Sequence, residues 1–211
     1  MSMVQETYRK QAEKLKAKFA QRNMEAFYCE TAEDARELVL SMIPEGATVT
    51  SGGSVTLEQT GILPALRSEK YAYISRTAST DPKEVQASYA RQVQADYFLM
   101  STNAFTADGE LVNIDGSSNR LAMLLHGPRY VIVVAGMNKL AMTRAEALAR
   151  VHNMAAPPNA ARLHRQTPCA VTGFCGDCHS PDTICCQEVV TRHSRIPGRI
   201  RVVLVGEPLG F

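Results

Sequence analysis

The apolar residues of the chain follow two spacings that alternate along its length. Steps of three and four residues predict an amphipathic helix over Val4–Phe19 and a second over Thr31–Met42, where Thr31 and Asp34 can form a capping box. Short, mostly apolar runs between such segments predict strands. The strongest, Tyr130–Gly136 (YVIVVAG), is apolar throughout and therefore typical of a strand buried on both faces of a sheet.

The same alternation continues along the rest of the chain. Helices are expected to begin near Leu57, at Asp81 and at Thr143, where capping residues precede amphipathic stretches. Further strands are expected at 47–50, 71–75, 96–100, 111–114 and 199–207, and a further helix at 119–126. Strands that alternate with helices predict an α/β domain whose central sheet is mainly parallel.

Composition fits one domain of moderate size with a proper core. The chain has 211 residues, of which 45% are hydrophobic and 21% charged, with a formal net charge of +2. This balance gives no reason to expect nucleic acid or an anionic membrane as a partner. The N-terminal segment lacks the apolar core of a signal peptide, and no run approaches the ~20 apolar residues of a membrane span. We therefore expect a cytoplasmic protein.

The first candidate for chemistry is the turn SGGSV after the strand at 47–50. Gly52 and Gly53 allow close approach of the backbone to a ligand, and Ser54 and Thr56 supply hydroxyls. A capping box of Thr56 and Gln59 would place a helix N-terminus beside them, which suits a phosphate or carboxylate. The spacing is neither that of a P-loop nor that of the dinucleotide fingerprint. A tight, well-capped turn without a ligand is the alternative.

A second polar segment, Ser101–Arg120, follows the strand at 96–100. In an open α/β sheet such segments border the ligand crevice at the strand ends. Its candidate ligand-binding residues are Asn103, Asn113, Asn119 and Arg120, and its candidate general bases are Asp108, Glu110 and Asp115. The alternative is a hairpin-like excursion with turns at Asp108-Gly109 and Asp115-Gly116.

Lys139 comes directly after the strongest predicted strand, in the sequence GMNKL. At the end of a central strand it would lie at the crevice and neutralise an anionic ligand; a solvated loop lysine is the alternative. We predict that Gly52, Gly53, Ser54, Asn103 and Lys139 converge on one pocket at the carboxyl ends of the strands.

Five of the six cysteines fall within Pro168–Cys186. Four of them, within seventeen residues, are Cys169, Cys175, Cys178 and Cys185. Clustered cysteines in a reducing compartment suggest Zn²⁺ or an iron–sulfur cluster, although the spacing specifies neither. A redox dithiol or disulfide, or reduced cysteines that simply pack, are the alternatives.

The motifs taken together resemble the lactate-utilisation (LUD) domain family. The resemblance rests on SGGSVTLEQTGI, NAFTADGELVNIDGSSNR, VIVVAGMNKL, AAPPNAARL and CGDCHSPDTICC, in that order. It implies a Rossmann-like fold similar to ribose-5-phosphate isomerase, glucosamine-6-phosphate deaminase and the CoA transferases. It covers roughly Thr31–Phe211, so we expect residues 1–30 to form an N-terminal helix packed on the core. Residues 31–211 would be a single domain that includes the cysteine-rich segment 168–186.

The resemblance also implies a function and a metal-ligand set. It suggests a soluble component of lactate-type organic-acid oxidation that binds an anionic metabolite or cofactor and associates with iron–sulfur oxidoreductase subunits or with copies of itself. Cys169, Cys175, Cys178 and Cys185 match the family's cysteine positions, which leaves Cys186 and His179 outside the ligand set. Two alternatives stay open: a free-standing enzyme of the sugar-phosphate isomerase or CoA-transferase type, and a non-enzymatic scaffold for an iron–sulfur partner.

Overall fold

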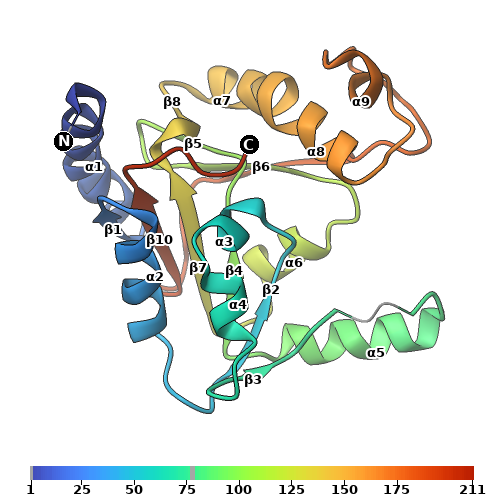
Figure 1. Ribbon diagram of the computed structural model, residues 1–211, viewed down its shortest axis with the longest axis horizontal. Coiled ribbons are helices and arrows are strands. Elements are labelled where there is room, and N and C mark those ends of the chain that lie inside the picture. Colours follow the sequence, from blue (N-terminus) through green and yellow to red (C-terminus); the bar gives the residue numbers. More distant parts are fainter. Residues whose placement is uncertain (1, 77–78) are drawn as a thin grey trace.

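The computed structural model describes residues 2–76 and 79–211, and a six-stranded parallel sheet forms its centre (Figure 1). The spatial order is β1-β10-β7-β4-β2-β3, with every neighbouring pair parallel. The strands are β1 (Glu25–Cys29), β2 (Thr48–Ser51), β3 (Ala72–Tyr73), β4 (Tyr97–Met100), β7 (Tyr130–Gly136) and β10 (Ile200–Val205). The expected α/β class is confirmed, and all of β7 after the partly buried Tyr130 is buried.

Helices cover both faces of this sheet because alternate residues of each strand point to opposite sides. Ile132 and Val134 pack with one face, which is covered by α2 (Ala32–Ser41), α3 (Val55–Gln59) and α4 (Ile62–Leu66). Val131 and Val133 pack with the other, which is covered by α1 (Met3–Ala20) and α6 (Asn119–Leu125). Helix α5 (Pro82–Val93) projects from the body of the molecule (Figure 1).

A second, four-stranded sheet was not expected from the sequence. It has the order β8-β5-β6-β9, comprising β8 (Leu140–Ala141), β5 (Ala104–Thr106), β6 (Leu111–Asp115) and β9 (Gln187–Thr191). Strands β5 and β6 form the anticipated hairpin, with Gly109 in the left-handed region (φ 79°). Asp115-Gly116 makes no hairpin turn, since it ends β6 and leads to α6. Behind this sheet lie α7 (Arg144–Arg150), a π-helical turn (Val151–Ala155) and α8 (Ala156–Arg162); α9 (Pro168–Thr172) begins the cysteine segment.

The first 30 residues are more than a helix packed on the core. Helix α1 does pack there, through Ala12, Leu15 and Phe19. It is followed, however, by the edge strand β1, which pairs with β10 along its whole length. A boundary after residue 30 therefore cuts through the central sheet. The mixed, half-buried residues of β1 carry no alternation strong enough to reveal a strand.

Local capping signals mostly agree with the structure. Thr31 with Asp34 and Thr143 with Glu146 form the expected capping boxes. The exception is α3, which begins at Val55 with Ser54 as its N-cap, so the expected box of Thr56 and Gln59 is wrong. None of the described helices is both long and apolar enough to cross a lipid bilayer.

Candidate functional site

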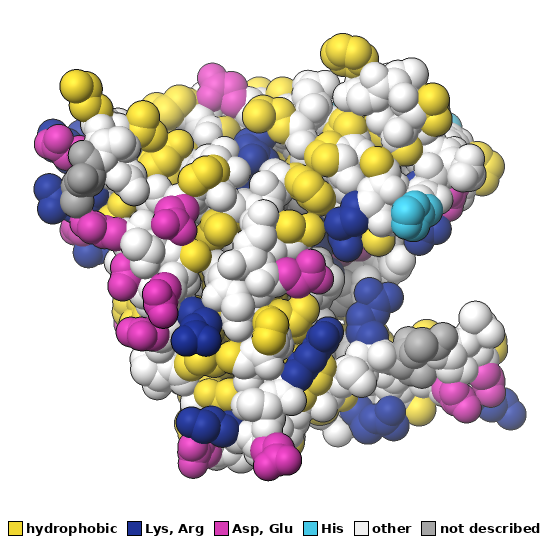
Figure 2. Space-filling model, viewed as in Figure 1, with side chains coloured by type: hydrophobic (Ala, Val, Ile, Leu, Met, Phe, Trp, Pro, Cys, Tyr) yellow, Lys and Arg dark blue, Asp and Glu magenta, His cyan; other side chains and the backbone are white. Residues whose placement is uncertain are grey.

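A polar cavity of about 380 Å³ lies where the strand order changes direction. From β2 the chain moves outward to β3, whereas β4, β7 and β10 follow on the other side of β2. Such a switch point leaves a crevice at the carboxyl ends of the strands. The cavity is bordered by the ends of β2, β4 and β7, and by α8. In the space-filling view the surface is hollowed between the α8–α9 region and the projecting α5, and Lys and Arg side chains gather there (Figure 2).

Most of the residues expected to share a pocket do line this cavity. They are Gly52, Gly53, Ser54, Thr56, Asn103, Asn119, Arg120 and Lys139. Asn113 is the exception, because it is fully buried behind the wall and accepts a hydrogen bond from Arg120. Asp115 also lines the cavity, and its carboxylate lies 3.3 Å from Arg120 Nε.

The glycine turn contributes space and backbone groups. The Gly52 N–H donates to Leu99 O at 3.0 Å, which fixes the turn against β4. A Cβ added at Gly53 would meet no atom of residues 2–76 or 79–211 within 4 Å, so there is open space beside the backbone there. Helix α3 has only five residues, so it adds little of the dipole expected from a longer helix. Charged side chains, rather than this helix, would therefore supply most of any attraction to an anion.

Lys139 is the most unusual of these side chains. It is 3% exposed, and its Nζ donates to Thr56 Oγ1 (3.1 Å), Ser101 Oγ (3.0 Å) and Thr102 O (3.2 Å). Burial, and then the nearby guanidinium groups of Arg150 and Arg120, lower the pKa of Lys139 to about 7. Among the residues that the structure describes, no carboxylate pairs with this amine, so its protonated form lacks the counter-charge that an anionic ligand would supply.

Arg120 holds the cavity wall rather than presenting a free guanidinium. Its NH1 donates to Ser101 O and Asn113 Oδ1, and its NH2 donates to Asn103 Oδ1 and Ile114 O. Because Asn103 Oδ1 also accepts from the Ile114 N–H, the amide of Asn103 is oriented with its oxygen turned to the wall. Asn103 Nδ2 has no hydrogen-bond partner among residues 2–76 and 79–211, and it is the donor left for a ligand.

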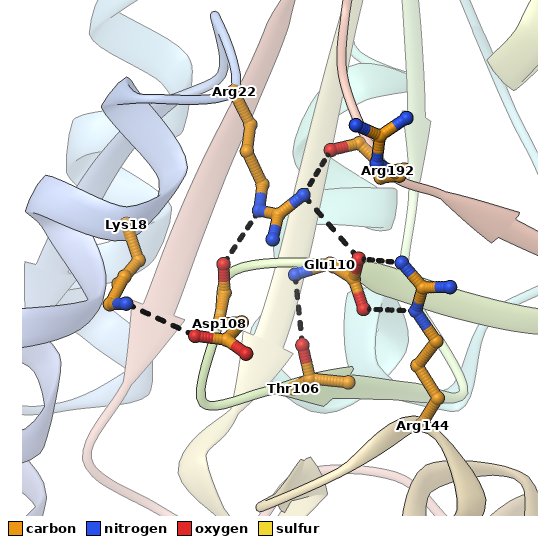
Figure 3. A network of polar contacts seen from close by, with 7 residues as sticks. All are labelled: Lys18, Arg22, Thr106, Asp108, Glu110, Arg144 and Arg192. Atoms are coloured by element: carbon orange, nitrogen blue, oxygen red, sulfur yellow. Dashed lines mark hydrogen bonds and ion pairs between the residues drawn. The ribbon is translucent and has the colours of Figure 1, made fainter.

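Two of the three candidate bases lie outside the cavity. Asp108 pairs with Lys18 at 3.1 Å, and Glu110 pairs with Arg144 and with Arg22, so together they clasp α1, the β5–β6 hairpin and α7 (Figure 3). The hydrogen bond from Arg144 is the main cause that lowers the pKa of Glu110, and that from Lys18 does the same for Asp108. This corrects their expected role at the site, because a carboxylate stabilised by cations is a poor proton acceptor.

The structure brings further residues to the cavity that the sequence did not single out. Arg76 and Ser101 line it from the central sheet side, and Asn159, Arg162 and Arg165 line it from α8 and the segment after it. The stretch AAPPNAARL, which contains Asn159 and Arg162, marked the family but carried no assigned role. Its place becomes clear only in the tertiary structure, which brings α8 to the border of the cavity.

The cysteine segment folds around a second cavity of about 100 Å³. Cys169, Cys175, Cys178 and Cys185 all line it, together with His152 and His179, whereas Cys186 is exposed and outside. Burial, followed by the proximity of the other four cysteines of the segment, raises the pKa of Cys185 to about 11. Cys175 Sγ lies 3.5 Å from His152 Nδ1, and His152 Nε2 lies 2.8 Å from Glu188 Oε1.

The donor set of this cavity suits a soft metal, but its arrangement is not that of a closed ligand shell. Thiolates and imidazoles favour Zn²⁺ and iron–sulfur clusters, and a carboxylate behind a histidine is a common orienting partner. Within the described part of the chain, however, no three such side chains stand in ligating geometry. All six cysteines are free thiols. Binding would have to draw the thiols of this segment together.

The fold and the cavity define a Rossmann-like α/β domain with a polar cavity at its switch point. The chain belongs to the LUD domain family, which is associated with lactate utilisation and whose family model matches residues 12–205. No curated protein matches the chain.

The solved structures that are similar to the chain include the following two. A DUF162 family protein from Deinococcus radiodurans matches 94% of this chain and 98% of its own, with 12% identity and a TM-score of 0.54. The DUF162 and LUD designations refer to the same family. At this identity the similarity shows the fold alone. The eIF2B delta protein from Chaetomium thermophilum matches 54% of this chain and 49% of its own, at 18% identity and a TM-score of 0.36, which supports no further argument.

Proposed function

We propose that the protein binds a small anionic metabolite in the switch-point cavity, as a component of lactate-type organic-acid oxidation. The observation that carries this proposal is Lys139, a buried amine that lines the cavity without a carboxylate partner among the described residues. Removing a cation from water without a counter-charge is unfavourable, and a bound anion reverses that cost.

The charge of the cavity supports the same conclusion. Of the described residues that line it, five are basic and Asp115 is the one acidic side chain; the basic residues are Arg76, Arg120, Lys139, Arg162 and Arg165. Asn103 Nδ2, the Ser54 region and the open backbone at Gly53 add neutral groups around the same space. A ligand with one or two negative charges and a few hydroxyl or carbonyl oxygens fits this lining.

Calorimetric titration tests the proposal. L-lactate, pyruvate, inorganic phosphate and ribose 5-phosphate are each titrated into the purified protein. We expect at least one to bind, and Lys139→Met to weaken its binding by about tenfold or more, since a buried charge pair is worth over ~1.4 kcal/mol. Lys70→Met is the matched control, because Lys70 is exposed and lies 3.8 Å from Glu45. Binding that is unchanged in Lys139→Met would contradict the proposal.

The alternatives differ in what the isolated chain does. A free-standing isomerase or CoA-transferase-like enzyme would turn over a phosphosugar or acyl-CoA alone, with Asp115 as the candidate base that lines the cavity. A subunit or a scaffold would be inactive alone and would be recovered with iron–sulfur proteins from its host. Affinity purification from that host, followed by iron, zinc and flavin analysis, separates these outcomes.

We also propose that the cysteine cavity binds zinc or an iron–sulfur cluster through Cys169, Cys175, Cys178 and Cys185. The supporting observation is that all four line one cavity and that their proximity disfavours the Cys185 thiolate, which a cation would favour. Bound metal would tie the segment together or supply electron transfer. The four thiols would hold the metal. Glu188 would orient His152, and His152 would in turn orient the thiol of Cys175.

Anaerobic purification with measurement of iron, zinc and acid-labile sulfide tests this second proposal. Cys178→Ser is expected to lose the bound metal, whereas Cys186→Ser, which alters an exposed cysteine outside the cavity, is expected to retain it. Reduced, metal-free protein of undiminished stability would reject the metal site.

A further inference from the structure

Lys139 differs from an ordinary buried lysine in the partners of its amine. All three hydrogen-bond partners of Nζ are neutral oxygens, two of them hydroxyls. Among the described residues Lys139 makes no ion pair. The charged groups that influence its pKa are Arg150 and Arg120, both of them positive. Arg150 is held behind it, donating to Asn138 O and Asn103 O.

The environment therefore favours the uncharged amine. Burial, Arg150 and Arg120 lower the pKa of Lys139 to about 7, so a large fraction is neutral at physiological pH. A neutral lysine amine at the wall of a cavity is a nucleophile for carbonyl carbon. Hydroxyl groups at 3.0 and 3.1 Å from Nζ can rotate to accept or donate, so they can pass protons during such a reaction.

We propose that Lys139 forms a covalent imine with a small anionic carbonyl compound bound in the switch-point cavity, an inference that rests on the proposed anion-binding function. Nζ attacks the carbonyl carbon and gives a carbinolamine. The C–O bond then breaks, and the oxygen leaves as water with the two hydrogens of the amine. No electron is transferred. The Ser101 and Thr56 hydroxyls move the protons, and the anionic group of the ligand faces the remaining cations of the cavity.

Two sources of such a ligand share this chemistry. A 2-oxo acid carries its carboxylate beside the carbonyl, and a phosphorylated sugar carries its phosphate several atoms away. The cavity of about 380 Å³ accommodates either. Both are therefore used as probes.

Reductive trapping tests the inference. The protein is incubated with pyruvate or with ribose 5-phosphate and sodium cyanoborohydride, which reduces an imine irreversibly to a secondary amine. Intact mass and peptide mapping then locate the adduct. We expect one adduct, on Lys139, with at least one probe, and a yield that rises between pH 6 and pH 8 as the amine loses its proton. Lys139→Arg keeps a cation but should give no adduct, and Lys70→Arg should react like the wild type.

The outcomes separate this inference from the proposed function. A probe that binds by calorimetry but leaves Lys139 unmodified overturns the imine and leaves anion binding intact. Failure of every probe to bind or react overturns both. Equal labelling of wild type and Lys139→Arg, spread over exposed lysines, also overturns the inference. Ser101→Ala provides a second measure: at equal ligand occupancy, slower trapping at Lys139 than in the wild type supports the proton-transfer role, and an equal rate contradicts it.

Discussion

Lys139 is a buried and Arg120 a half-buried basic residue at the cavity, yet only Arg120 has a carboxylate beside it. Arg120 has Asp115 beside it and four oxygen acceptors around its guanidinium. Lys139 has only neutral oxygens, and the positive charges of Arg120 and Arg150 act against its ammonium form. The cavity thus contains a guanidinium with a structural role, that of Arg120, and an amine that can lose its proton, that of Lys139.

This difference predicts an unusual pH dependence of stability. The folded pKa of Lys139 is about 7 and the unfolded value is ~10.4, so between these the unfolded chain binds the additional proton. Lys139 therefore destabilises the fold at and below pH 7, and this penalty disappears as pH rises. Relative to Lys139→Met, the wild type should gain at most about 1.4 kcal/mol per pH unit from pH 7 to 10.

Urea unfolding of both proteins across this pH range measures the effect. The charged groups that face the amine are Arg120, from α6, and Arg150, from α7, and neither titrates in this range. Lys70→Met, an exposed lysine, should show a constant difference from the wild type up to about pH 9. A constant difference for Lys139→Met as well would contradict the lowered pKa.

At the scale of elements, the segment after β10 passes very close to Gly136, the last residue of β7. A Cβ added at Gly136 would lie 2.6 Å from Glu207 O and 2.7 Å from Leu209 N. These are backbone atoms, so the segment after β10 would have to shift. That segment places Gly210 next to Lys139 and Phe211 next to Arg150.

We predict that Gly136→Ala lowers the free energy of unfolding by about 1–3 kcal/mol and also weakens anion binding. Gly53→Ala is the matched comparison, since its added methyl group meets nothing within 4 Å. Gly53→Ala should change the free energy of unfolding by no more than about 0.5 kcal/mol. Its effect should be confined to ligand binding in the cavity that Gly53 lines. Thermal unfolding and calorimetry check both. Equal stability of the two variants would show that the close approach at Gly136 is unimportant.

The ion pairs of Glu110 join the β5–β6 hairpin to Arg144 of α7 and to Arg22, which follows α1. Glu110→Gln removes the charge that pairs with Arg144 and Arg22, and leaves two cations partly uncompensated. We expect a loss of about 2 kcal/mol at pH 7 and unchanged ligand affinity. Because the folded pKa of Glu110 is lowered, its contribution is complete above the ordinary glutamate pKa and is lost as pH falls through the folded value.

The control is Glu13→Gln, which alters an exposed pair with Lys16 on α1 and should change stability by less than about 1 kcal/mol. Denaturant unfolding at pH 7 and at pH 3 separates the two variants, since the cost of Glu110→Gln should shrink in acid. Loss of ligand turnover or binding in Glu110→Gln with unchanged stability would restore its candidacy as a base.

At the scale of the molecule, α1 packs on the shared core and β1 pairs with β10, so we expect both to unfold together with the rest. Phe19 is fully buried and contacts Phe105 of the second sheet, with ring centroids 6.4 Å apart. Phe19→Ala should therefore lower the free energy of unfolding by about 3–5 kcal/mol. The whole chain should still unfold in one cooperative transition, with a lower midpoint. Val4→Ala, on the exposed side of α1, should have little effect. A main transition that stays in place in Phe19→Ala would indicate a separable N-terminal segment.

Much of the fold was predictable from the sequence because its signals are local. The apolar run of β7 and the capping boxes at Thr31 and Thr143 depend on residues a few positions apart. The glycine turn, Asn103 and Lys139 could be placed at one edge because each follows a strand, and parallel strands end at the same edge.

Other features depended on which distant segments the chain brings together. The sequence around Asp108 and Glu110 does not indicate their partners. Those partners, Lys18, Arg22 and Arg144, lie 34 to 90 positions away along the chain. The short strands of the second sheet, such as β9, gain stability only from pairing with one another. Local sequence signals were thus enough for the α/β alternation and for the polar residues at the strand ends. The strand order, the approach of α8 to the cavity and the pairing of its charged side chains depend on contacts between distant segments, because burial and neutralisation are properties of the assembled chain.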